Sequence, residues 1–346
     1  MFGLLEPSPT MLTTAQLGLL VLLSLTVGSS VAWLIVLSRR SQGRTTFPAP
    51  STAEAPWGLS DLFIVAAIWL TSMFATALIA DRALGLAANT PAAADRESAP
   101  SAELESTGDA SDRSPPAAPL HAGLFFVSAV CSLLACVASL AYLHLRFGPK
   151  AWRFLGLRDW KRQLGFGLLG FLLAMPPVIW LMSLLIRFLK YEHMTLDALA
   201  GSPTPAVIAA TWFSAGLVAP LTEEFFFRYV LQSWLFRVRL RDNPIHRWNV
   251  LYGDPPTRAA EPIAEPAQDL GPRTLLPIVC SSLCFAFMHA GQGPAPIALF
   301  VYALALGYVY HRTGSLIPCI VMHMLLNVYS LTLATLAALE AQGAVS

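Results

Sequence analysis

The chain has 346 residues, of which 55% are hydrophobic and only 12% are charged. Soluble domains carry roughly 25% charged residues, so this composition indicates a protein that lies largely in lipid. The formal net charge of +1 gives no electrostatic basis for binding nucleic acid, and the expected surroundings of the chain are the lipid bilayer.

Apolar segments of roughly 20 residues, the length that crosses a bilayer as a helix, recur about eight times along the chain. In chain order they are Leu12–Leu37, Leu59–Ala80, Leu120–Leu143, Leu164–Leu189, Ala206–Phe236, Thr274–Ala290, Pro296–Tyr310 and Leu316–Leu339. The sequence therefore predicts an all-α fold, a polytopic transmembrane helical bundle of about eight spans. We expect an integral, multi-pass membrane protein of the bacterial inner (cell) membrane.

Two segments interrupt the apolar pattern. Residues 91–119 are rich in proline, alanine, serine and acidic residues, a composition that cannot bury a core and predicts a disordered loop. Residues 241–273 are again rich in proline and contain several arginines, which indicates an extended insert. We therefore divide the chain into N-terminal transmembrane segments (1–148), a unit that carries the polar motifs (149–338) and a short tail (339–346).

The basic residues predict the orientation in the membrane. Most of the 22 lysines and arginines fall in the connections that follow the odd-numbered spans. These are Arg39, Arg40, Arg44, Arg146, Lys150, Arg153, Arg158, Lys161, Arg162, Arg237, Arg239, Arg241, Arg247, Arg258, Arg273 and Arg312. Because basic loops remain in the cytoplasm, both chain termini are expected on the opposite side.

The stretch LTEEFFFRYVLQ places two glutamates and an arginine inside an apolar segment. Burying an ionisable group in a membrane span costs about 2.5–3.5 kcal/mol, so such residues mark candidate functional sites. Glu224 and Arg228 are four residues apart and share a helix face, so we expect them to pair. Glu223 is left without an obvious partner and is available as a general base. The alternative is a purely structural salt-bridge cluster.

Three further polar residues fall within the last predicted spans. His289 lies in the sixth span, and His323 and Asn327 lie in the eighth. The i, i+4 spacing of His323 and Asn327 places both on one helix face, where they can direct donors at one point, as an oxyanion requires. A single histidine on an apolar helix is commonly a core residue, but this set is harder to explain by packing.

Three short patterns carry a resemblance to a known family: Glu223-Glu224-x-x-x-Arg228, Phe285-x-x-x-His289 and His323-x-x-x-Asn327. In this order they resemble the motifs of the CPBP family, the CAAX-protease and bacteriocin-processing family, also called the Abi family, of intramembrane glutamic endopeptidases. The resemblance covers about residues 150–338. It implies a CAAX prenyl protease-like hydrolase that cleaves a peptide or a membrane-associated protein.

The resemblance also implies roles for individual residues. Glu223 would activate a water molecule with help from His289, while His323 and Asn327 would stabilise the tetrahedral oxyanion. This mechanism uses neither a metal ion nor a cofactor.

Two residues would support the first glutamate, and a third residue departs from the family pattern. Glu224 and Arg228 are the supporting pair. Tyr229 stands where the family usually has a small residue, which predicts a narrower cavity.

Two other functions remain open from the sequence. A zinc metalloprotease could use the same histidines and glutamate, although the chain contains no HExxH pattern. A non-catalytic membrane scaffold or immunity protein could keep the polar cluster for structure alone.

Overall fold

The computed structural model describes residues 14–48, 55–89, 118–157, 159–190, 194–240, 247–253 and 272–345. Within these ranges every regular element is helical and no strand is present, which confirms the predicted all-α class. The predicted loop 91–119 lies outside the described residues except for its last two positions. Most of the insert 241–273 also lies outside them.

Each of the eight predicted apolar segments is helical over most of its described residues. In chain order the elements are α1 (Thr14–Ser41), α2 (Leu59–Asn89), α3 (Ala118–Phe147), η1 (Gly148–Leu155), α4 (Trp160–Leu185), α5 (Met194–Gly201), α6 (Pro205–Thr211), η2 (Trp212–Val218), α7 (Ala219–Glu224), η3 (Phe225–Gln232), α8 (Ser233–Leu240), α9 (Arg247–Tyr252), α10 (Pro272–Phe287), α11 (Ala295–Thr313) and α12 (Leu316–Val345). Elements α6 to α8 follow one another without a break and form a single long stack.

Six of the described helical segments are long and apolar enough to cross a membrane. They are Gln16–Ser41, Leu59–Arg82, Ala122–Trp152, Trp160–Leu185, Pro205–Val238 and Leu316–Gln342. A shorter apolar helix, Leu275–Phe287, belongs to α10. The membrane-spanning helical bundle is therefore confirmed, and the expected number of about eight spans is approximate.

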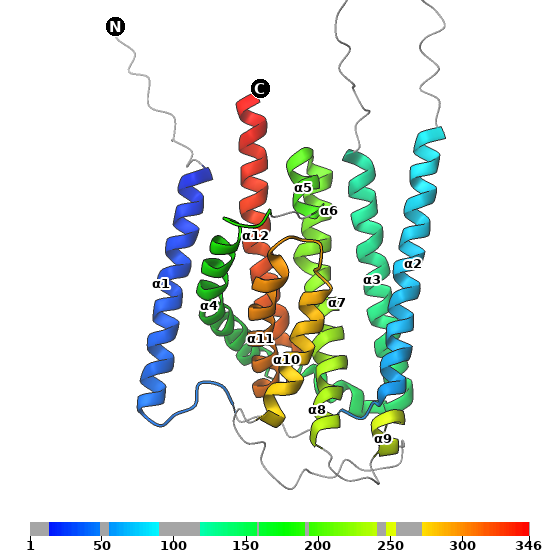
Figure 1. The fold of residues 1–346 in the computed structure, drawn as a ribbon, viewed down its shortest axis with the longest axis vertical. Coiled ribbons are helices and arrows are strands. Elements are labelled where there is room, and N and C mark those ends of the chain that lie inside the picture. Colours follow the sequence, from blue (N-terminus) through cyan, green and yellow to red (C-terminus); the bar gives the residue numbers. More distant parts are fainter. Residues whose placement is uncertain are drawn as a thin grey trace, which may run out of the picture.

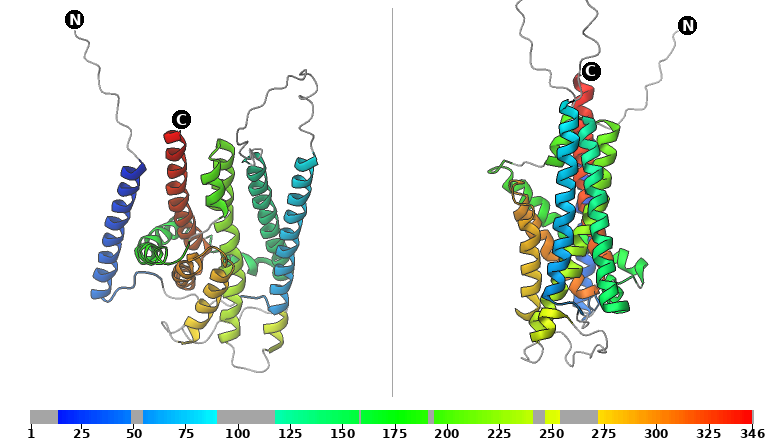
Figure 2. Two further views of the ribbon diagram at one scale, coloured as in Figure 1. Left: turned by 45° about the horizontal axis from the view of Figure 1, so that its top comes forward. Right: turned by 90° about the vertical axis from the view of Figure 1, so that its right-hand side faces the viewer.

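The helices run side by side in one bundle (Figure 1). α1 and α4 lie toward one edge and α2 and α3 toward the other, with α12, the α6–α8 stack and the α10–α11 hairpin between them (Figures 1 and 2). α1 begins and α12 ends at the same end of the bundle, and the α10–α11 hairpin stops short of that end (Figure 1).

The other end of the bundle is called the basic end here. α1, α3, α8 and α11 all finish there (Figure 1). Basic side chains of their last turns or of the adjoining chain include Arg39, Arg40, Arg146, Arg237 and Arg312. The helix directions therefore have the alternation that the predicted membrane orientation requires.

Close packing of α4 against α12 positions the polar residues of α12. A Cβ atom added at Gly167 would lie 2.7 Å from the Cβ of Val321, and one added at Gly170 would lie 2.6 Å from the sulfur of Met322. At Gly167 a Cβ atom would also lie 3.0 Å from the Pro318 carbonyl oxygen, so this separation of the two helices requires glycine at that position.

The connection between α1 and α2 packs beneath the motif-bearing helices. Trp57 is fully buried and donates its indole N–H to the Val230 carbonyl of η3 at 3.0 Å. Arg312 donates from Nε to the Pro48 carbonyl at 2.8 Å, and Arg237 donates to the Ala55 carbonyl. These contacts cross the boundary predicted near residue 148, which remains a prediction.

Candidate active site

The glutamates lie between two π-helical segments of the α6–α8 stack. α7 carries Glu223 and Glu224 and is preceded by η2 and followed by η3. In η2 the hydrogen bonds span five residues, since Ala219 N–H donates to the Ser214 carbonyl. π-Helical turns inside α-helices are uncommon and occur frequently at functional sites.

Because of Pro220, one backbone carbonyl of this stack lacks a backbone donor and can accept a hydrogen bond from a side chain. The next bond of the five-residue pattern would join residue 220 to the Ala215 carbonyl, but proline has no N–H. Asn327 of α12 takes this place, donating from Nδ2 to the Ala215 oxygen at 2.7 Å. A partly buried carbonyl inside the membrane needs a donor, and the Asn327 amide supplies the one that Pro220 lacks.

This arrangement predicts a coupling between two substitutions. Asn327→Ala should lower the free energy of unfolding by about 1–3 kcal/mol, because the Ala215 carbonyl loses its donor. In a Pro220→Ala background the new N–H can satisfy that carbonyl, so the same substitution should cost less than half as much. Unfolding in detergent, measured for both single variants and the double variant, checks this. Equal costs in the two backgrounds would contradict it.

Glu224 and Arg228 form the pair that their spacing predicts. Arg228 Nε donates to Glu224 Oε2 at 3.1 Å, and neither side chain is exposed. The guanidinium also donates from Nη1 to Ser281 of α10 at 2.9 Å. Gln232 donates from Nε2 to the Gly307 carbonyl of α11 at 2.8 Å. Arg228 and Gln232 thereby link the α6–α8 stack to the α10–α11 hairpin.

Two of these supporting residues were not found from the sequence. Gln232 lies four positions after Arg228 and on the same helix face, a spacing that could have indicated it. Ser281 lies on a different helix, and a serine in an apolar helix carries no comparable signal.

His323 is oriented by the same buried carboxylate. Its Nδ1 lies 2.9 Å from Glu224 Oε1, so this nitrogen carries a proton when Glu224 is ionised. Its Nε2 lies 3.9 Å from Glu223 Oε2. Glu224 therefore turns the other face of the imidazole toward Glu223.

His289 approaches Glu223 from the turn that follows α10. Its Nδ1 lies 2.9 Å from the Phe285 carbonyl and must donate, because a carbonyl oxygen can only accept. Its Nε2 lies 3.9 Å from Glu223 Oε2. Two imidazole Nε2 atoms from different elements thus face one carboxylate oxygen.

That oxygen is buried and has no hydrogen-bond partner among the described residues, although the Glu223 side chain as a whole is 28% exposed. Separations of 3.9 Å are too long for direct hydrogen bonds to the histidines. Buried polar atoms normally have a hydrogen-bond partner, so the space between Glu223 Oε2 and the histidines suits a small polar molecule such as water.

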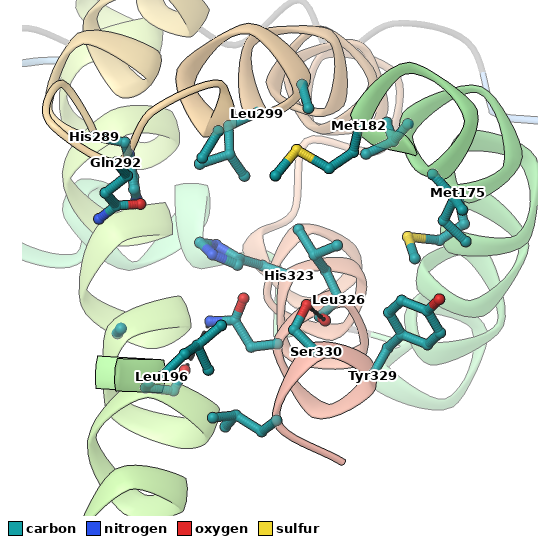
Figure 3. Close-up of a pocket in the computed structure, with 18 of the residues that line it drawn as sticks. Met175, Met182, Leu196, His289, Gln292, Leu299, His323, Leu326, Tyr329 and Ser330 are labelled. Carbon is teal, nitrogen blue, oxygen red and sulfur yellow. Dashed lines mark hydrogen bonds between the residues drawn. The ribbon is translucent and has the colours of Figure 1, made fainter. Parts of the chain in front are cut away.

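The predicted catalytic residues line one cavity of about 420 Å³. Glu223, His289, His323 and Asn327 all belong to its wall. Figure 3 shows His289 and Gln292 on one side and His323 on α12 near the centre, with Met175 and Met182 of α4 opposite. The sequence did not indicate Gln292 or the methionines, which come from segments without a motif.

Tyr229 does not narrow this cavity, so that prediction is wrong. Its side chain is fully buried and donates to the Ala151 carbonyl at 2.9 Å. Its ring packs on Phe225 and Trp57, with centroid distances of 4.9 and 4.8 Å. The tyrosine is six residues beyond Glu223 and turns away from the cavity toward η1 and the α1–α2 connection.

In the part of the chain that the structure describes, no group of three or more histidine, cysteine, aspartate or glutamate side chains is arranged to hold a metal ion. The converging set at Glu223 is a carboxylate between two imidazoles.

Comparison with known proteins defines the class. Residues 205–329 match the family model described as Type II CAAX prenyl endopeptidase Rce1-like, and this range contains all three motifs. The match supports a membrane-embedded endopeptidase of the CAAX protease type, and thus a hydrolase. Residues 205–329 thus match an Rce1-like domain of the CPBP/CAAX protease family, which confirms the resemblance seen in the motifs. Searches of curated proteins and of solved structures found no significant match.

Proposed function

We propose that this protein is a CAAX prenyl protease-like glutamic endopeptidase that hydrolyses a peptide bond within the membrane, using a water molecule activated by Glu223 and no metal ion. The observation that carries the proposal is the unpartnered Glu223 Oε2, which faces Nε2 of His289 and of His323 at 3.9 Å each on the cavity wall. The substrate is a peptide or a membrane-associated protein, and the location is the bacterial inner membrane.

A shared water explains these separations. A water within hydrogen-bond reach of Glu223 Oε2 and of a histidine Nε2 can bridge a separation of 3.9 Å, which is too long for a direct bond. It donates one hydrogen to Glu223 Oε2 and the other to His289 Nε2, which carries the lone pair because Nδ1 donates to Phe285. As the water oxygen attacks the carbonyl carbon, Glu223 takes its proton.

The tetrahedral oxyanion needs donors on the same wall. His323 donates from Nε2 when its ring carries both protons, and the Glu224 carboxylate at 2.9 Å is the counter-charge for that state. Asn327 uses one amide N–H for the Ala215 carbonyl and has a second for the oxyanion. Collapse breaks the C–N bond, and Glu223 returns its proton to the leaving nitrogen.

The proposal is tested by measuring peptide hydrolysis by the purified protein. The activity should be lost in the Glu223→Gln variant and should persist in the presence of metal chelators. We expect EDTA and 1,10-phenanthroline to leave the rate of peptide cleavage within about twofold of the untreated protein, because no step uses a metal. A zinc enzyme treated in parallel is the positive control for the chelators. Loss of cleavage that zinc restores would favour the metalloprotease alternative.

A further inference from the structure

The cavity extends from Glu223 in one direction only. Within the α6–α8 stack its lining residues are Ala215, Ala219 and Glu223, and none follows Glu223. On α12 they begin at His323 and continue through Leu331. The stack descends toward the basic end and α12 ascends from it (Figure 1), so both helices place the cavity on the side of Glu223 away from the basic end.

The other contributing elements agree with this direction. α4 lines the cavity with residues of its second half, from Met175 to Ser183, and Ile186 follows just beyond its end. α5 adds Leu196, and the α10–α11 turn adds His289 and Gln292. α5 lies at the end of the bundle opposite the basic end (Figure 1).

On the basic side of Glu223 the bundle is closed by packed side chains. Phe225, Tyr229 and Val230 of η3 are at most 3% exposed. Tyr302 of α11 and Met322 of α12 are fully buried in the same cluster, with the Tyr302 hydroxyl donating to the Met322 carbonyl at 2.7 Å. The glutamate and His323 therefore form the floor of the cavity.

The opposite end is open by comparison. Ser183 and Ile186 of the cavity wall are exposed, and Leu196 is half-buried. The turn between α10 and α11 lies below this end (Figure 1) and contains the exposed Gly291 with φ of 98°. Non-helical backbone at membrane depth is tolerated where it lines a water-filled cavity, which here would be the space above the hairpin.

From these observations we infer that the cavity opens to the non-cytoplasmic side of the membrane, and that its substrates are peptides or membrane-protein segments presented from that side. In the sequence most of the lysines and arginines fall in the connections that follow the helices finishing at the basic end, so this end faces the cytoplasm. The apolar wall of Met175, Val178, Met182 and Leu326 suits apolar residues beside the scissile bond. The substrate class rests on the proposed function, whereas the direction of opening does not.

Cysteine accessibility tests the direction. Ser330→Cys and, separately, Gln292→Cys are placed in a chain in which Cys131, Cys136, Cys280 and Cys284 are serine, while the fully buried Cys319 is kept. Right-side-out and inverted membrane vesicles are treated with a membrane-impermeant maleimide. Gln42→Cys, at an exposed position of the α1–α2 connection at the basic end, is the matched control, and the chain without an added cysteine gives the baseline.

We expect both cavity variants to be labelled at least tenfold faster in right-side-out vesicles, and Gln42→Cys to show the reverse. Labelling of the cavity variants only in inverted vesicles, or in neither preparation while the control reacts, would overturn the inference. Labelling of Gln42→Cys from outside would overturn it as well. Since labelling requires no hydrolysis, an inactive protein labelled as expected would refute only the proposed function.

The substrate class has its own readout in the same vesicles. A membrane-impermeant peptide with apolar residues on both sides of a fluorogenic bond should be cleaved when added to right-side-out vesicles and spared by inverted ones. Cleavage confined to inverted vesicles would refute the substrate class even if the enzyme is active.

Discussion

Replacing Glu223 by glutamine is expected to lower the rate of peptide hydrolysis by roughly 10²–10⁴-fold, the contribution typical of a positioned general base. The amide has nearly the same shape as the carboxylate but cannot accept the proton of the attacking water. Thermal unfolding should be little changed, because Glu223 Oε2 has no hydrogen-bond partner among the described residues. The measurement is kcat for a peptide that the parent protein cleaves, in detergent or in liposomes.

Glu340→Gln is the matched control for this substitution. Glu340 is an exposed residue near the end of α12 and lies outside the cavity wall, so its loss of charge should leave kcat unchanged. A Glu223→Gln protein that keeps the full rate would refute the glutamate mechanism. Absence of hydrolysis in the parent protein itself, over a broad set of peptides, would favour the scaffold or immunity alternative.

Replacing Arg228 by alanine is expected to lower the free energy of unfolding by about 3–5 kcal/mol, because it leaves the Glu224 charge buried without compensation. Both side chains are fully buried, so water cannot replace the lost partner. Ser281 and Gln232 would lose a donor at the same time. Unfolding in detergent, followed by heat or denaturant, measures the change.

The double variant Glu224→Gln/Arg228→Met separates charge from packing. Removing both charges avoids an uncompensated ion, so the double variant should be more stable than Arg228→Ala alone. Arg44→Ala, at an exposed arginine of the α1–α2 connection, is the control and should change stability by no more than about 0.5 kcal/mol. A double variant as unstable as the single one would show that the guanidinium contacts, and not the ion pair, account for the loss.

Much of the protein was determined by local sequence. Long apolar segments predict helices because a chain in lipid must satisfy its backbone hydrogen bonds internally, and the structure is helical in each predicted segment. The Glu224–Arg228 pair followed from i, i+4 spacing, which brings two side chains together on any helix. The three motifs were also sufficient to indicate the family that residues 205–329 match.

Only the tertiary structure decided how the polar residues from different helices meet. Spacing along α12 placed His323 and Asn327 on one face, but their partners, Glu224 and the carbonyl released by Pro220, belong to the α6–α8 stack. The direction of Tyr229 and the one-sided cavity likewise depend on how each helix is rotated against its neighbours. Sequence periodicity defines the faces of a helix, whereas close packing between helices, as at Gly167 and Gly170, selects which face meets which neighbour.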